Sequence, residues 1–330
     1  MRANLSMSQI LGAALIAVLA SVSAQAQEWP AKPVTFITPA AAGNSPDVAG
    51  RIVADRLTQI WKQQIVILNR PGAGGLIAAQ AAAGVPKDGY TLYMSQSSTF
   101  NVLPIEQEGK MPVNLQTAFA PIGMVGEQPI ALAVNKDVPA NSIAELIALA
   151  NKTPGGMLFG ATNRGGQSHL TGELFRDRAK ANISFVHSAG AAVSANDVIA
   201  GRLPIIFEGL AALVPGIQSG GIRLLGVASQ QRLPNFPNLP AINEGVPGVV
   251  SSGWIVLLAP TGVPESIVAK VNADLRKVVA IPDVIERLQE LGTYTRDLTP
   301  VQTGEFMRSE ERLWWPVVRQ VNQRDAAPAR

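Results

Sequence analysis

The chain has 330 residues, and 27 basic against 24 acidic side chains give a formal net charge of +3. This near balance, with no basic run interleaved with aromatic residues, argues against nucleic-acid binding. The absence of cysteine excludes disulfides, thiolate nucleophiles and cysteine-based metal sites.

Residues 1–26 have the pattern of a secretory signal peptide. Arg2 gives a positive start, Ile10 to Val22 is apolar, and Ala24-Gln25-Ala26 matches a cleavage site. The apolar stretch is shorter than the roughly 20 residues that a membrane span needs. We expect cleavage after Ala26 and a mature chain in the periplasm. The alternative is a retained N-terminal anchor.

Strands and helices are predicted to alternate along the rest of the chain. Apolar runs bounded by turn residues predict strands at 34–38, 65–68, 90–95, 121–126, 130–134, 158–161, 184–186, 205–207, 224–228 and 254–259. Helices are predicted at 48–61, 76–83 and 146–151, with helix-start signals at Ser142, Pro264, Pro282 and Thr299-Pro300. Pro316 is expected to kink or break the last helix after Trp315.

This alternation predicts an α/β fold with mainly parallel strands. A chain of this length makes one large domain or two medium ones. We expect two domains, with the chain crossing between them near Gln128 and Ser251. Residues 27–128 and 252–330 then form the first domain, and residues 129–251 form the second.

The loop Gly43-Asn44-Ser45-Pro46-Asp47 joins the first predicted strand to a helix. Ser45 suits the N-cap, Pro46 the first helical position and Asp47 the first turn. Free backbone N–H groups and the positive end of the helix dipole at such a start can hold an anion. The alternative is an ordinary capped helix start that meets no ligand.

Three segments of the chain resemble the periplasmic receptors of tripartite tricarboxylate transporters, also called the Bug family. They are Pro39–Arg51, Asn69–Leu92 and Gly160–Leu170, and the similarity continues through Phe207-Glu208-Gly209 and Gly253-Trp254. The resemblance implies an α/β, two-domain, periplasmic-binding-protein-like (Venus flytrap) fold, with a carboxylate trapped in the cleft between the domains.

The resemblance also implies a set of ligand-binding positions. Two loops and two further polar positions match the family's ligand site: Gly43, Asn44, Ser45 and Asp47 in the first loop, Thr162, Arg164, Gly165, Gln167, Ser168 and His169 in the second, and Ser97 and Glu208 elsewhere. Asp47 is expected to orient its loop rather than to meet an anionic ligand directly.

Two departures from the family pattern bear on the ligand. Ala40 stands where the family usually has an aromatic residue, which should enlarge the pocket. Arg164 stands where the family often has an apolar or small residue, and a guanidinium is a rigid, strong donor for a further carboxylate. We therefore favour a dicarboxylate or an aromatic carboxylate as the ligand.

Several of these residues also have a structural interpretation. His169 can be a structural histidine, Arg164 a solvated loop residue, and Glu208 the partner of a nearby base or a helix cap. Ser168 with His169 or His187 suggests a secreted hydrolase. However, adjacency alone does not place a nucleophile and its base in contact, and no G-x-S-x-G motif is present.

Two other kinds of site are not favoured. Gly72-Ala73-Gly74 lacks the third glycine of a dinucleotide-binding fingerprint, because Ile77 occupies its place. The two histidines lack the neighbouring carboxylates of a metal-binding motif.

The sequence therefore predicts a monomeric periplasmic receptor, not an enzyme, that needs no cofactor and captures a small organic acid. By the resemblance, its partner is a two-component membrane permease. The alternatives are a secreted Ser/His hydrolase, an orphan receptor that presents its ligand to a signalling system, and a non-binding scaffold.

Overall fold

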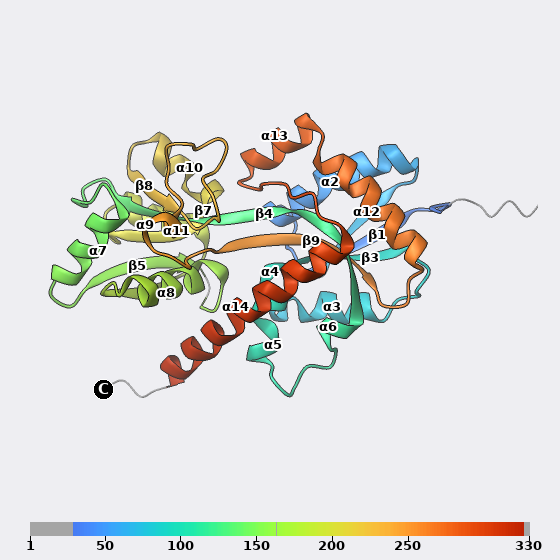
Figure 1. The fold of residues 1–330 in the computed structure, drawn as a ribbon, viewed down its shortest axis with the longest axis horizontal. Helices are drawn as coiled ribbons and strands as arrows, with labels where there is room; N and C mark the ends of the chain where they lie inside the picture. The colour runs from blue at the N-terminus through green and yellow to red at the C-terminus, as the bar shows by residue number, and fades with distance from the viewer. Residues whose placement is uncertain (1–28, 163, 327–330) are drawn as a thin grey trace, which may run out of the picture.

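The computed structural model describes residues 29–162 and 164–326, so the predicted signal peptide and its cleavage after Ala26 lie outside the described residues. Figure 1 shows two lobes, with the long strands β4 (Phe119–Asn135) and β9 (Ser252–Pro260) running between them. None of the helices in the described part combines the length and apolar character that spanning a bilayer requires.

The first lobe is a mixed sheet with helices on both faces. Its strands are β1 (Val34–Thr38), β2 (Ile65–Asn69), β3 (Thr91–Gln96), β9 and the first part of β4, in the order β2-β1-β3-β9-β4. One face packs on α2 (Ser45–Trp61), α12 (Glu265–Val279) and α13 (Pro282–Glu290). The other packs on α3 (Leu76–Ala83), which follows the short η1 (Ala73–Gly75), and on α4 (Ser97–Asn101), α5 (Leu103–Glu106) and α6 (Leu115–Ala118).

The second lobe repeats this layering around the end of β4. Its other strands are β5 (Met157–Thr162), β6 (Ile183–Ser188), β7 (Ile205–Gly209) and β8 (Ile222–Val227). Its helices are α7 (Ile143–Lys152), α8 (Gln167–Ala179), α9 (Ala191–Ile199), α10 (Leu210–Gln218) and α11 (Ile242–Gly245). Successive residues of a strand face opposite sides, so Leu132 enters the core under α7 and α8 and Ala133 enters the core under α9 and α10.

Strand β4 links the lobes without a break. It pairs with β9 as far as Pro129, and from Ile130 it pairs with β7 and β8 instead. The prediction of two separate strands, at 121–126 and 130–134, is therefore wrong. Pairing with β9 keeps residues 126–129 extended, although Gly126 and Pro129 are residue types typical of turns. The pairing partner of β4 thus changes at Ile130, two residues beyond Gln128, near which the chain is predicted to cross between domains.

The prediction of mainly parallel strands is also wrong. β1 pairs in parallel with β2 and β3, and β5 with β6 and β7. β9 is antiparallel to β3 and β4, and β4 is antiparallel to β7 and β8. A strand that is buried on both faces is a continuous apolar run, and that pattern does not report its direction.

Most of the predicted helix starts are confirmed. The Ser142 hydroxyl accepts a hydrogen bond from the Glu145 N–H at 3.1 Å, which caps α7. Pro282 begins α13, and Pro300 begins the last helix, α14 (Pro300–Ala326). Pro264 lies at the N-cap of α12, immediately before its first turn.

Helix α14 runs from the first lobe along to the second (Figure 1). It continues through Pro316, so a break after Trp315 is wrong. Trp314, Val318 and Val321 are buried in the core of the second lobe. Because this apolar packing continues on both sides of the proline, it offsets the backbone hydrogen bond that proline cannot donate.

Candidate functional site

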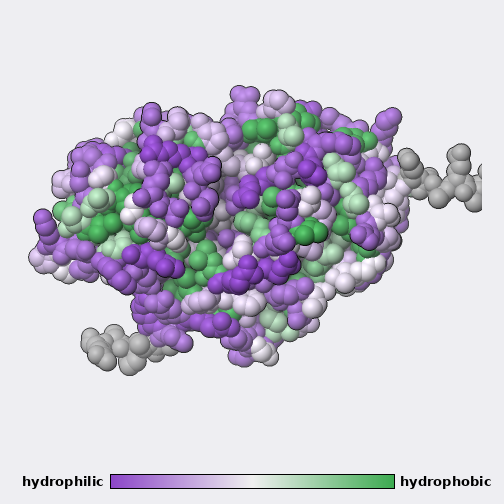
Figure 2. Space-filling view, viewed as in Figure 1, coloured by the Kyte–Doolittle hydropathy of each residue, from purple (hydrophilic) through white to green (hydrophobic). Residues whose placement is uncertain are grey.

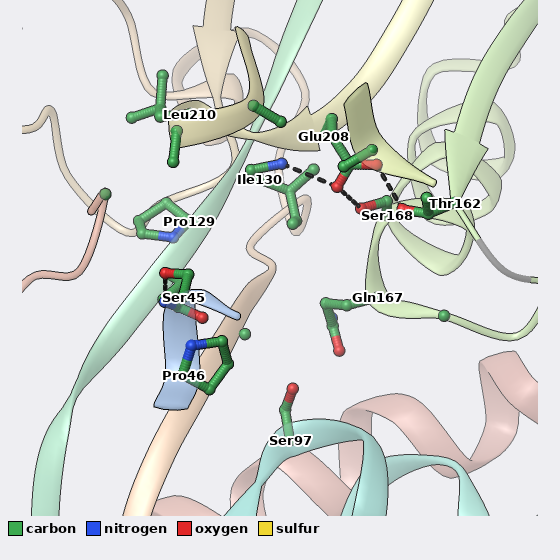
Figure 3. A pocket seen from close by; sticks show the side chains of 18 of the residues that line it. Ser45, Pro46, Ser97, Pro129, Ile130, Thr162, Gln167, Ser168, Glu208 and Leu210 are labelled. Atoms are coloured by element: carbon green, nitrogen blue, oxygen red, sulfur yellow. Dashed lines mark hydrogen bonds between the residues drawn. The ribbon is translucent and has the colours of Figure 1, made fainter. Parts of the chain in front are cut away.

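A pocket with a volume of about 350 Å³ lies between the lobes. We call it the interlobe pocket and define it by its lining: Ser45, Pro46, Gln96, Ser97, Ser98, Gln128, Pro129, Ile130, Thr162, Gly166, Gln167, Ser168, Ala191, Glu208, Gly209, Leu210, Ala211, Ala212, Gly253, Trp254, Leu291 and Gly292. Figure 3 shows side chains from both lobes facing one open space, and Figure 2 shows a recessed band between two largely hydrophilic lobes.

Four helices begin at the wall of the interlobe pocket. α2 comes from the first lobe, and α8, α9 and α10 from the second; their first residues, Ser45, Gln167, Ala191 and Leu210, belong to the lining. In none of these four described helix starts does the N-cap side chain bond to the first-turn N–H groups. Uncapped N–H groups and the positive ends of helix dipoles attract anions.

In the loop before α2, the residue at the helix N-cap differs from the prediction. Asn44, not Ser45, occupies the N-cap of α2, and its side chain makes no cap bond. The Ser45 hydroxyl donates to the Leu291 carbonyl at 3.2 Å and accepts from Gln128 Nε2 at 2.7 Å. Ser45 therefore ties α2 to the strand that joins the lobes. Gly43 and Asn44 are close in sequence to the lining but do not belong to it.

Asp47 lies behind the first loop and is buried. Its carboxylate accepts hydrogen bonds from the Gly43 N–H at 2.9 Å, Arg51 Nε at 3.0 Å and Asn69 Nδ2 at 2.7 Å. Burial acts to raise the pKa of Asp47, but the bonds from Arg51, Asn69 and Gly43 outweigh it and hold this pKa below its ordinary value. Asp47 orients the loop and does not line the pocket.

A cluster of acceptors lies on the second-lobe side of the pocket. Glu208, at the end of β7, accepts hydrogen bonds from the Thr162 hydroxyl at 2.5 Å, the Ser168 hydroxyl at 2.6 Å and the Gly209 N–H at 3.1 Å. Figure 3 shows the three side chains turned toward one another. We call Thr162, Ser168 and Glu208 the acceptor cluster, because both hydroxyl protons point at the carboxylate.

Arg164, Gly165 and His169 lie outside the interlobe pocket. The buried His169 accepts a hydrogen bond from the Gly165 N–H on Nδ1 at 3.0 Å, and its Nε2 lies 3.8 Å from the carboxylate of Glu173. The Arg164 guanidinium carbon lies 5.5 Å from the ring centroid of Phe185. His169 thus holds the second loop in shape, and direct contact of Arg164 with a ligand stays a prediction that this arrangement does not favour.

Ser97 and Gln167 face each other across the pocket in Figure 3, from α4 and α8 respectively. Gln167 Nε2 donates to the Ser251 hydroxyl at 2.8 Å, so this side chain also fixes the chain near the predicted crossing. Ala40 is buried but does not line the pocket. That the absence of a ring at position 40 enlarges the pocket stays a prediction.

Sequence reasoning missed the helix start at Leu210–Ala212, and the wall residues Gln128 and Trp254. A strand that ends at Glu208-Gly209 and precedes an apolar helix is a signal that could have identified α10 as a further helix start. The role of Gln128 depends on long-range contacts, because its amide donates to Ser45 and, at 2.9 Å, to Thr293.

The geometry does not favour a Ser/His hydrolase. The Ser168 hydroxyl donates to Glu208, while the adjacent His169 bonds to the Gly165 N–H. His187 is exposed on β6. A nucleophilic serine needs a base within hydrogen-bond reach. In the described part of the chain, no group of three His, Cys, Asp or Glu side chains is placed to hold a metal ion.

Two lobes around a cleft, each an α/β layer structure, define a two-domain protein of the periplasmic-binding-protein type. Residues 49–323 match the family described as tripartite tricarboxylate transporter family receptor. The chain belongs to this family, which consists of substrate-binding receptors rather than enzymes. The predicted family and fold class are thereby confirmed.

Individual relatives agree with this assignment. Protein BugT of Bordetella pertussis is 32% identical over 296 residues, which are 89% of this chain and 91% of BugT. Rpa4515 of R. palustris, solved with adipate, is 30% identical with a TM-score of 0.74, over 89% of this chain and 99% of that one. MatC from Rhodopseudomonas palustris, solved with malate, is 26% identical with a TM-score of 0.71, over 88% of this chain and 100% of MatC.

Proposed function

We propose that this protein is a periplasmic receptor that closes around a small dicarboxylate in the interlobe pocket. The observation that carries the proposal is the convergence of four uncapped helix starts, from both lobes, on that pocket. A carboxylate placed there contacts N–H groups of both lobes, so it binds the closed arrangement more tightly than the open one.

The ligand class is supported by two solved relatives. Rpa4515 was solved with adipate and MatC with malate, and both ligands are dicarboxylates. A volume of about 350 Å³ lies within the range of small-molecule sites. An aromatic carboxylate is the second ligand class, and the same binding panel tests it.

The remaining parts of the proposal concern the partner and the location. Family membership supports delivery of the ligand to a two-component membrane permease, and the N-terminal pattern supports export with cleavage after Ala26. We propose a monomer, with residues 27–128 and 252–330 in the first domain and 129–251 in the second. A signalling role instead of transport predicts normal ligand uptake in cells that lack this protein.

Thermal unfolding with a panel of carboxylates tests the proposed function. A ligand at 100-fold excess over its Kd stabilises a binder by about 2.7 kcal/mol. We expect dicarboxylates to raise the unfolding temperature and uncharged diesters of the same acids to have no effect. A flat response to every carboxylate contradicts the proposal and favours the scaffold alternative.

A matched pair of variants assigns the binding to the interlobe pocket. Ala212→Phe places a ring in the pocket lining and is expected to abolish the thermal shift. Val214→Phe makes a similar change two residues along the same helix, at an exposed position outside the lining, and is expected to retain it. Equal shifts in both variants place the binding site elsewhere.

A further inference from the structure

Within the interlobe pocket, the described lining contains one ionisable side chain, that of Glu208. It is 6% exposed and accepts hydrogen bonds from Thr162, Ser168 and the Gly209 N–H. An acidic side chain is an unexpected component of a site that holds an anion, because like charges in a partly dehydrated pocket repel strongly.

The hydroxyl groups beside Glu208 do not offset this repulsion. A serine or threonine hydroxyl has one proton to donate and two lone pairs that accept. Both the Thr162 and the Ser168 hydroxyl protons are directed at Glu208. These hydroxyls therefore present lone pairs to the pocket, so all three side chains of the acceptor cluster offer acceptors to a ligand.

Most side-chain N–H donors of the described lining are also engaged within the protein. Gln128 donates to Ser45, Gln167 to Ser251, and Trp254 to Glu310. The donors that remain for a carboxylate are therefore the backbone N–H groups at the helix starts and, from the first lobe, the hydroxyls of Ser97 and Ser98. A carboxylate suits those groups, whereas the acceptor cluster suits a group that donates.

From this polarity we infer that the ligand is a carboxylate that also carries a hydrogen-bond donor, a hydroxyl or an ammonium group, which it directs at Glu208, Thr162 and Ser168. The inference rests on the proposed function and narrows it. The acceptor cluster selects substituted acids over plain ones, because a plain chain places methylene groups against lone pairs that can each accept a further hydrogen bond.

Calorimetric titration with six named acids tests the inference: succinate, malate and aspartate, and adipate, 2-hydroxyadipate and 2-aminoadipate. Within each set the carbon chain is constant and only the donor changes. We expect the best substituted acid to bind at least about tenfold more tightly than its parent, as a hydrogen bond to a charged acceptor predicts.

Variants assign the preference to the acceptor cluster. Glu208→Gln keeps the shape but replaces one acceptor oxygen with a donating amide, and is expected to reduce the preference to about threefold or less. Ser168→Ala removes one hydroxyl and is expected to weaken the preference even if Glu208→Gln folds poorly. Glu108→Gln, at an exposed position that pairs with Arg319, is the matched control and should keep the full preference.

The outcomes separate the two proposals. If parent and substituted acids bind equally tightly, or if Glu208→Gln and Ser168→Ala both retain the preference, the inference is overturned and the carboxylate receptor stands. If none of the six acids binds, the proposed dicarboxylate ligand is wrong and the inference fails with it, and the aromatic carboxylates of the thermal panel then decide whether the carboxylate receptor stands.

Discussion

At the scale of single residues, Glu310 lies at a junction behind the interlobe pocket. Its Oε2 atom accepts hydrogen bonds from the indole N–H of Trp254 at 3.0 Å and of Trp314 at 3.2 Å, and from Asn101 Nδ2 at 3.2 Å. Trp254 lines the pocket and Asn101 ends the helix that carries Ser97. One carboxyl oxygen thus links α14 to the pocket wall.

The buried position of Glu310 leads us to expect a specific pH dependence of the free energy of unfolding. Burial raises its pKa from 4.5 to about 7, against the effect of its three N–H donors. Since the unfolded chain releases this proton at lower pH than the folded one, the free energy of unfolding falls as the pH rises from about 4.5 to 7, by at most about 3 kcal/mol. Glu310→Gln removes this dependence.

Urea unfolding of wild type and Glu310→Gln at pH 4.5, 6 and 8 measures this contribution. Between pH 4.5 and pH 8, the free energy of unfolding of the wild type is expected to fall relative to that of Glu310→Gln. Glu305→Gln, an exposed change on the same helix, controls for general effects of charge. A constant difference between wild type and Glu310→Gln across the three pH values contradicts the assignment.

The sequence predicted single-residue roles where local geometry determines them. An acid in the first turn of a helix points back at the preceding loop, which is what Asp47 does. Arg164 and His169 could not be placed in this way. Their directions depend on contacts with Phe185 and Glu173, which come from another strand and from the next turn of α8.

At the scale of elements, two glycines inside helices are expected to respond differently to substitution by alanine. A Cβ on Gly172 of α8 would lie 2.2 Å from the ring of Phe159, which is fully buried. A Cβ on Gly50 of α2 would lie 2.2 Å from the terminal methyl of Met94, which is flexible and can move aside. The same substitution therefore meets a rigid neighbour in one helix and a mobile one in the other.

Gly172→Ala is expected to lower the free energy of unfolding by about 2 kcal/mol, because overpacking a rigid core costs more than the gain in helix propensity. Gly50→Ala is expected to be close to neutral. Urea unfolding of both variants beside wild type measures the two values. Equal effects would show that the ring of Phe159 yields as readily as Met94.

Apolar periodicity, turn residues and helix caps were enough to predict most of the helices and strands. Ser142 and Pro282 marked helix starts because their signals are local. The continuity of β4 and of α14 could not be predicted, since Gly126 and Pro316 are breakers in isolation. Pairing with β9 and packing of Trp314 override them, and both contacts join distant parts of the chain.

At the scale of the whole molecule, the site exists only where the two lobes meet. The first lobe contributes the start of α2, and the second contributes the starts of α8, α9 and α10 with the acceptor cluster. The family resemblance correctly implied two lobes with a cleft between them. Which of its loop residues line that cleft depends on how the lobes pack, which local sequence patterns do not encode.

A crystal structure of the protein with its tightest-binding dicarboxylate tests the central claim most directly. We predict density for the ligand in the interlobe pocket, with carboxylate oxygens about 3 Å from backbone nitrogens in the first turns of α2 and α8. A ligand bound outside this pocket, or held by one lobe alone with either helix start turned away from it, would contradict the account.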